Sequence, residues 1–248
     1  MLPLLKNELA QLIKKNDRIA PSPVNMNSSV KQLILKNQYK IIKHCFPPAE
    51  IAEISETDFQ IHSQFAEGDL LLYIFSLLGV TNRRDVEICA GNGTECMAAH
   101  LLINHGRAGR SFDGNEKNIL VGVALYHPPQ MTSYSPLRIK HAWITQENIN
   151  WWIQDEGRPN SIDLLSWDID GNNYYIWATL SVVTPGVVIC ETSNYIPPDL
   201  PFAISDRGNL VYTDGKQPRE FKATSHTTIT KQIRPKALSY YRRTPLWI

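Results

Sequence analysis

The feature that most constrains this chain is a glycine-containing junction between a predicted strand and a predicted helix. Residues 83–95 read RRDVEICAGNGTE, in which an apolar run ends at Gly91-Asn92-Gly93 and a helix-like stretch follows. Glycine at such a junction lets the backbone approach a ligand closely, and the following helix N-terminus offers free N–H groups and a partial positive charge. The junction therefore predicts an α/β protein with a ligand site beyond the end of this strand.

The spacing of the junction narrows the class of ligand. A dinucleotide fingerprint requires a third glycine where this chain has Cys96, and a phosphate loop requires Lys-Ser/Thr where it has Thr94-Glu95. Glu87 lies within the predicted strand and can face the same crevice. An acidic strand followed by a two-glycine loop is the usual form of an S-adenosylmethionine (SAM) site. A tight strand–helix turn without a ligand is the alternative at this point.

From about residue 68 the chain alternates predicted strands and helices. The predicted strands are 85–90, 110–113, 138–144, 162–169 and 186–191. The predicted helices are 69–79, 94–105 and 173–182, with two more that begin near 115 and 146. Strands that alternate with helices imply right-handed crossovers and a parallel sheet, so the fold class is α/β.

Two segments flank this alternating core, which we assign to 61–200. Residues 1–60 contain predicted helices at 1–16 and 29–45, and we assign them to a helical extension that caps the sheet or mediates homodimerisation. The strand–helix alternation fades in 201–248. We interpret this atypical C-terminal segment either as a rearranged substrate lid or as a sign of lost activity.

Composition argues against several classes of partner. A net charge of +1 gives no strong attraction to nucleic acid or to an anionic membrane. No apolar run approaches the roughly 18 residues that a membrane span needs. The four cysteines form no C-x-x-C pair, which argues against a zinc site or a disulfide framework. We therefore expect a cytoplasmic protein that has no membrane partner and no nucleic-acid partner.

Ligands of open α/β sheets bind beyond the carboxyl ends of the strands, so the residues at those ends are the candidates. Asp113, followed by Gly114, ends the second predicted strand and is placed to hydrogen-bond ribose hydroxyls, with helix capping as the alternative. Trp143 and Ile144 end the third predicted strand. Their indole or aliphatic face suits an adenine sandwich, and core packing is the alternative for Trp143.

Asp168 and Asp170 form a second signal at the end of the fourth predicted strand. Residues two apart in an extended strand point to the same side, so the two carboxylates repel each other and favour a cation or a shared proton. They suit Mg²⁺ or Mn²⁺, with Glu191 and Asn194 as further oxygen ligands. Alternatively, one of them accepts a proton from a substrate hydroxyl. Helix capping by Asp170 and a structural hydrogen bond by Asp168 are the non-functional interpretation.

Six segments, taken together, resemble a known family. They are SQFAEG at 63–68, VEICAGNG at 86–93, FDGN at 112–115, WITQENIN at 143–150, DLLSWDIDGNNY at 163–174 and VVICE at 187–191. In this order and spacing they resemble the FkbM-like class I SAM-dependent methyltransferases. That family usually has Glu-Asp where this chain has Glu67-Gly68, often has Asp at the place of Asn92, and has a last helix and an antiparallel strand pair that we do not find after about 200.

The resemblance implies a Rossmann-like class I methyltransferase sheet with SAM as the methyl donor. Glu87, Gly91 and Gly93 would face the methionine and ribose portion of SAM, and Asp113 its ribose hydroxyls. The cofactor-binding residues implied or suggested by strand-end position are Glu87, Gly91, Asn92, Gly93, Asp113, Gly114, Trp143 and Ile144. The leading acceptor is a hydroxyl of a sugar, a nucleotide sugar or a natural product, with Asp168 and Asp170 as catalytic base or metal ligands.

Two other functions stay open from the sequence. One is a non-catalytic SAM-fold scaffold that binds a partner through its N-terminal helices, which the unusual C-terminal segment suggests. The other is an enzyme on a similar sheet that uses a nucleotide sugar or NAD, against which the missing third glycine argues.

Overall fold

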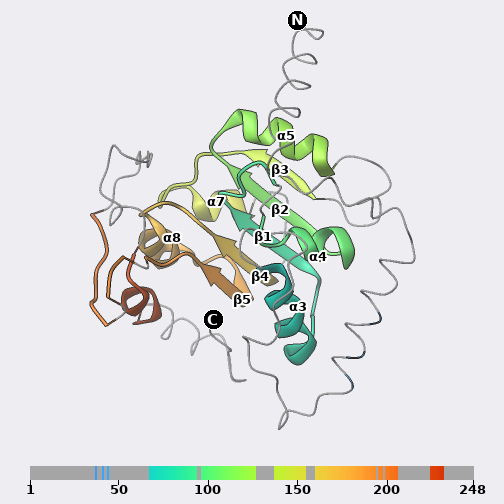
Figure 1. Ribbon diagram of the computed structural model, residues 1–248. Helices are drawn as coiled ribbons and strands as arrows, with labels where there is room; N and C mark the ends of the chain where they lie inside the picture. The colour runs from blue at the N-terminus through green and yellow to red at the C-terminus, as the bar shows by residue number, and fades with distance from the viewer. Residues whose placement is uncertain are drawn as a thin grey trace, which may run out of the picture.

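The computed structural model describes residues 37, 41, 44, 67–93, 96–126, 137–154, 160–193, 195–197, 199–205 and 224–231. In these residues a five-stranded parallel sheet of order β3-β2-β1-β4-β5 lies between two layers of helices (Figure 1). The strands are β1 (Arg84–Ile88), β2 (Ala108–Asp113), β3 (Arg138–His141), β4 (Ser161–Trp167) and β5 (Thr184–Cys190). The helices are α3 (Glu67–Leu78), α4 (Ala99–Asn104), α5 (Glu116–Tyr126), α7 (Ile149–Gln154) and α8 (Asn173–Thr179).

This arrangement confirms the predicted α/β, Rossmann-like fold. All five predicted strands pair in parallel, and β1 is hydrogen-bonded to both β2 and β4. Two helix starts differ from the prediction. The helix predicted from 94 begins at Ala99, and the helix predicted from about 146 begins at Ile149. In both places a hydrogen-bonded turn precedes the helix, which residue periodicity does not distinguish from the helix itself.

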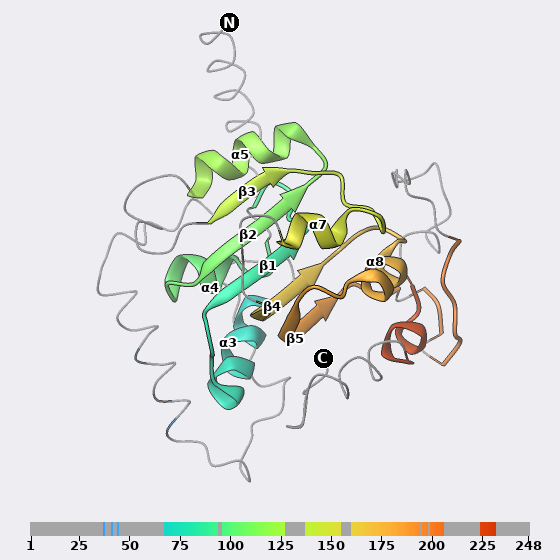
Figure 2. The same cartoon turned by 180° about the vertical axis from the view of Figure 1, so that it is seen from behind.

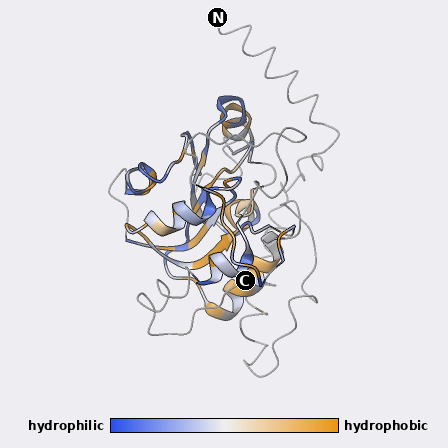
Figure 3. Cartoon of the chain, turned by 90° about the vertical axis from the view of Figure 1, so that its left-hand side faces the viewer, coloured by the Kyte–Doolittle hydropathy of each residue, from blue (hydrophilic) through white to orange (hydrophobic). Residues whose placement is uncertain are grey.

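Helices cover both faces of the sheet. α3, α4 and α5 lie on one face, and α7 and α8 lie on the other (Figure 2). β4 is therefore buried without interruption from Ile162 to Trp167, as expected for a parallel strand between two helical layers. On the second face, Trp167 stacks on Trp177 of α8, with ring centroids 5.2 Å apart. Hydrophobic residues are accordingly concentrated in the sheet and on the helix faces toward it (Figure 3).

The flanking segments of the sequence prediction fall mostly outside the described residues. In 1–60 only Asn37, Ile41 and His44 are described, each in a helical conformation, so the 1–16 helix and the role of this extension are untested. In 201–248 the described pieces are 201–205 and 224–231, and no strand after β5 occurs in them. None of the described helices has the length and apolar composition that crossing a membrane requires.

A buried polar network fastens the amino ends of the central strands. Asp163 of β4 accepts hydrogen bonds from the backbone N–H groups of Thr81 (3.0 Å) and Arg83 (2.8 Å) and from the Thr81 hydroxyl. Arg107 pairs with Asp85 of β1, and its guanidinium also lies 3.5 Å from the Asp163 carboxylate. Because Asp85, Arg107 and Asp163 are all buried, each charge depends on these partners for its solvation.

We predict that Asp163→Asn lowers the free energy of unfolding by about 2–4 kcal/mol, since an amide cannot replace the carboxylate toward several N–H donors and Arg107. Urea denaturation measures the change. The matched control is Asp199→Asn, an exposed aspartate expected to stay within about 0.5 kcal/mol of the parent chain. Equal effects of the two substitutions would contradict a structural role for the network.

Candidate functional site

The strand order locates the candidate site between β1 and β4. From β1 the chain proceeds to β2 and β3 on one side, and then returns to β4 and β5 on the other side. At such a switch point the connections leave the carboxyl ends of two neighbouring strands in opposite directions, which opens a crevice for ligands. The segments that meet there follow β1, β2, β4 and β5, and they contain most of the residues selected from the sequence.

The loop after β1 adopts the conformation that its glycines permit. Gly91 and Gly93 have φ angles of 57° and 81°, in the left-handed region that residues with a Cβ rarely occupy. A Cβ at Gly91 would meet nothing within 4 Å, so this residue borders open space. A Cβ at Gly93 would lie 2.7 Å from the Tyr126 ring, so this residue is packed against the protein. A ligand can therefore approach the loop from the side on which Gly91 lies.

Asp113, at the end of β2, fixes the loop from the neighbouring strand. Its Oδ2 accepts the backbone N–H of Gly91 (2.9 Å). Its Oδ1 accepts the backbone N–H of Asn115 (2.8 Å) and the side-chain amide of Asn118 (3.0 Å). The position of Asp113 is compatible with both interpretations from the sequence, which were helix capping and hydrogen bonding to ribose hydroxyls. The hydrogen bond to Gly91, however, is a third role that the sequence pattern did not reveal.

Glu87 is buried beneath the loop. Its carboxylate accepts the Cys96 thiol and the backbone N–H groups of Met97 (2.8 Å) and Ala98 (3.1 Å), so it caps the turn that leads into α4. Burial raises the pKa of Glu87, and the three hydrogen bonds act in the opposite direction. The carboxylate is thus engaged by the protein itself, and contact of Glu87 with a cofactor stays a prediction.

Trp143 and Ile144 follow β3 and differ in exposure. The Trp143 side chain is exposed and lies close over Gly114, where a Cβ would come within 2.5 Å of the indole ring. Ile144 is buried in the core cluster on the α7 and α8 face. The indole therefore offers an accessible aromatic surface beside the end of β2, and the alternative interpretation of Trp143 as a core residue is wrong. Ile144, in contrast, packs in the core. Adenine binding by either residue stays a prediction.

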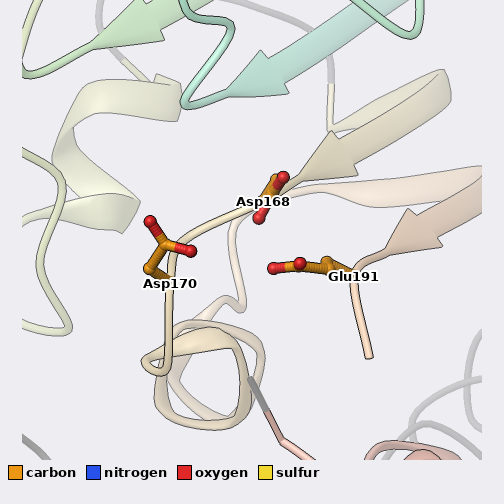
Figure 4. A group of neighbouring side chains, drawn as sticks. All are labelled: Asp168, Asp170 and Glu191. Carbon is orange, nitrogen blue, oxygen red and sulfur yellow. The ribbon is translucent and has the colours of Figure 1, made fainter. Parts of the chain in front are cut away.

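Asp168, Asp170 and Glu191 come together at the ends of β4 and β5. One carboxylate oxygen from each lies within 4.8 Å of those of the other two, and the side chains point toward a common centre (Figure 4). We call these residues the acidic triad. Asp168 Oδ1 is buried and has no hydrogen-bond partner in the described part of the chain. Asn194, the fourth predicted ligand, lies outside the described residues.

Asn173 is a site residue that the sequence analysis missed. Its Oδ1 accepts the backbone N–H of Ile169 (2.9 Å), and its amide donates to the backbone carbonyl of Glu191 (3.0 Å). The side chain is fully buried. Asn173 therefore ties the loop that carries Asp168 and Asp170 to the end of β5, and so holds the triad together. An amide as the first residue of α8, three residues after Asp170, is the signal that was available in the sequence.

Cys89 interacts with both parts of the site, the support of the glycine loop and the acidic triad. Burial raises the pKa of its thiol, and the negative charges of Asp113, Asp168, Asp170 and Glu87 raise it further. The residue has a φ of 61°, which is unusual for a side chain with a Cβ and costs about 1 kcal/mol. The charged groups that act on Cys89 are all carboxylates, and they come from both the loop side and the triad side of the site.

Comparisons with known proteins give structural likeness only. No protein-family model matches the chain, and no curated protein matches it. The chain is similar to the crystal structure of the N-terminal domain of EvdMO1 with S-adenosylhomocysteine (SAH) bound, at 11% identity and a TM-score of 0.45, over 83% of this chain and 86% of that one. It is also similar to a putative protein-L-isoaspartate O-methyltransferase from Plasmodium falciparum in complex with SAH, at 12% identity and a TM-score of 0.34, over 75% and 84% of the two chains. At these values the likenesses do not establish a family.

We predict opposite stability changes at two carboxylates of this site. Asp168→Asn should raise the free energy of unfolding by about 1 kcal/mol without added metal, because it relieves repulsion within the acidic triad. Asp113→Asn should lower it by about 1–3 kcal/mol, because it disrupts hydrogen bonds to the glycine loop. Chemical denaturation in a metal-chelating buffer measures both. A loss of stability in Asp168→Asn would show that the triad is held together without a ligand.

Proposed function

We propose that this chain is a SAM-dependent methyltransferase that methylates a hydroxyl oxygen. The observation that carries the proposal is the pairing, at one switch point, of a fixed two-glycine loop with the acidic triad across the crevice. The loop offers close backbone approach to a cofactor, and the triad offers groups that accept a proton or hold a cation. The resemblance of the sequence to the FkbM-like methyltransferases supports the same assignment.

The space beside Gly91, the exposed indole of Trp143 and the nearby carboxylates support SAM as the ligand. Gly91 borders open space at the loop, and the exposed indole of Trp143 offers a stacking surface for adenine. The carboxylates around Cys89 favour a sulfonium cation over a diphosphate. A carboxylate has about four acceptor positions, of which Asp113 uses three, so one remains for a ribose hydroxyl. In this proposal Gly91, Asn92 and Gly93 line the methionine portion, and Glu87 acts beneath the loop.

The acidic triad would act on the acceptor. SAM supplies a methyl group activated on a sulfonium, which the acceptor oxygen takes as SAH departs. This chain contributes position and proton transfer: Asp170 accepts the hydroxyl proton, and Asp168 orients the acceptor by accepting a second hydrogen bond. Asn173 keeps both carboxylates at the crevice through its bonds to Ile169 and Glu191. Methyl transfer needs little more than such alignment, because the leaving group is already activated.

The triad also fits a divalent cation. Carboxylate oxygens are the ligands that Mg²⁺ and Mn²⁺ prefer, and three of them converge here from two strand ends. Asp168, Asp170 and Glu191 would hold the ion, with Asn194 as the further ligand predicted from the sequence. A bound cation would offset the repulsion among the carboxylates and increase the acidity of an acceptor hydroxyl.

The charge of the site bears on the class of acceptor. An uncharged hydroxyl of a sugar or natural product enters a negative crevice without electrostatic cost, whereas a nucleotide sugar brings a diphosphate that the carboxylates repel. We therefore favour a neutral polyhydroxy acceptor, and we expect a nucleotide sugar to be accepted only together with a divalent cation.

The first test is cofactor binding. Calorimetry should detect SAM and SAH binding to the parent chain. Asp170→Ala should abolish methyl transfer to a panel of hydroxylated acceptors, measured as SAH release, while the Kd for SAM changes no more than about threefold, since the residue acts on the acceptor. If neither SAM nor SAH binds the parent chain, the enzyme assignment fails and the non-catalytic scaffold is favoured. Loss of SAM binding in the variant alone would move Asp170 to the cofactor pocket.

The second test separates metal binding from proton transfer. If the triad holds a cation, millimolar Mg²⁺ or Mn²⁺ should raise the melting temperature of the parent chain but not that of Glu191→Gln, because binding to the folded state alone stabilises it. Asp199→Asn serves as the control for non-specific binding to surface carboxylates. A shift of equal size in all three chains would rule out a metal site at the triad and leave the proton-acceptor role.

A further inference from the structure

Helix α5 contacts the glycine loop through residues four apart on one of its faces. They are Asn118, Gly122 and Tyr126, which the 3.6-residue repeat brings to one side of the helix. The opposite side of α5 exposes Leu120 and Val123. We call the three inward residues the α5 stripe.

The first contact between the α5 stripe and the glycine loop is indirect and is made through Asp113. The side-chain amide of Asn118 donates to Asp113 Oδ1 (3.0 Å), and Oδ2 of the same carboxylate accepts the backbone N–H of Gly91 (2.9 Å). The hydrogen bond from Asn118 holds the carboxylate in the orientation that reaches Gly91. This is the loop residue that borders open space, so its position decides what a ligand meets.

The second contact depends on the missing side chain of Gly122. A Cβ at this position would lie 3.2 Å from the backbone oxygen of Asn92 and 2.7 Å from the Ile139 side chain. Gly122 has an ordinary helical position in α5, so backbone freedom does not explain the glycine. Close approach of the loop to the helix does explain it.

The third contact is a hydrogen bond from a buried phenol. Tyr126 donates to the backbone oxygen of Gly93 (2.7 Å), and its ring fills the space that a Cβ of Gly93 would occupy. Burial raises the pKa of this phenol well above its usual value, so it stays a donor at every physiological pH. Gly93 is thereby held from the side opposite the crevice.

We infer that the α5 stripe positions the glycine loop, with Asn118, Gly122 and Tyr126 as positioning residues for Gly91, Asn92 and Gly93 in turn. The inference rests on the proposed function insofar as the loop binds SAM. None of the three residues needs to touch the ligand. Each restricts one loop residue, so the loop is ordered before binding and the ligand avoids the entropic cost of ordering it.

The test compares Tyr126→Phe with Tyr175→Phe. Each substitution removes one phenol that donates to a backbone carbonyl, that of Gly93 (2.7 Å) in the first case and that of Ile204 (2.9 Å) in the second. We expect both variants to melt at a lower temperature. Only Tyr126→Phe should speed hydrogen exchange at the amides of Gly91 and Gly93, by about fivefold or more, and weaken SAH binding by about five- to tenfold. Equal exchange rates and equal affinities in the two variants would overturn the inference.

A pair of glycine substitutions provides the second comparison. Both Gly122→Ala and Gly109→Ala place a methyl group against hydrophobic side chains. At Gly122 the neighbour is Ile139 of β3, and at Gly109 of β2 the neighbours are Leu102 and Leu137. Only Gly122→Ala also presses on Asn92, so only this variant should change exchange in the loop. Exchange does not require a ligand. If the parent chain binds no SAH while the loop still responds only to the α5 variants, the methyltransferase proposal fails and the positioning role stands.

Discussion

Burial of carboxylates in a parallel sheet is the constraint on which the rest of this structure depends. At the amino ends of the strands, Asp85 and Asp163 are buried and are neutralised by Arg107 and by backbone N–H groups. At the carboxyl ends, Glu87 is satisfied by the turn before α4. These contacts fasten β1 to α4 and to β4, because a buried charge without partners would cost several kcal/mol. The positions of the hydrogen-bond donors to these buried carboxylates therefore constrain how the central strands lie.

The carboxylates at the crevice have two different kinds of surroundings. Asp113 is surrounded by donors and is part of a rigid loop support. One carboxylate oxygen each of Asp168, Asp170 and Glu191 instead lies within 4.8 Å of the other two. Asn173 bonds the backbones of Ile169 and Glu191 rather than these carboxylates. Repulsion among neighbouring carboxylates is costly for a fold, and such cost is typical of functional sites. The carboxylate of Asp113 is therefore held by donors, whereas the triad is the part of the crevice that we propose to interact with a cation, a proton or an acceptor.

Much of the fold could be predicted from the sequence, because apolar runs and glycine or aspartate at their ends mark strands that alternate with helices. Gly91, Asp113, Asp168 and Glu191 were each assigned to a strand end, and the structure has them there. The partners of their oxygens were not predictable. Whether Glu87 faces a crevice or a helix end depends on how the turn at Met97 and Ala98 folds back on β1. Asn173 was missed for the same reason, since its two partners come from different segments.

The two halves of the crevice also respond differently to sequence change. The loop depends on contacts over one face of α5, where Gly122 is irreplaceable by a larger residue without moving Asn92 or Ile139. The triad depends on the ends of β4 and β5, which Asn173 joins. Cys89, at a φ of 61°, interacts electrostatically with carboxylates of both halves. A ligand that spans the crevice would touch a preordered surface on the loop side and a mutually repelling set of charges on the other. Under the proposed function, the interactions that change during methyl transfer would then lie mainly at the carboxylates of the triad.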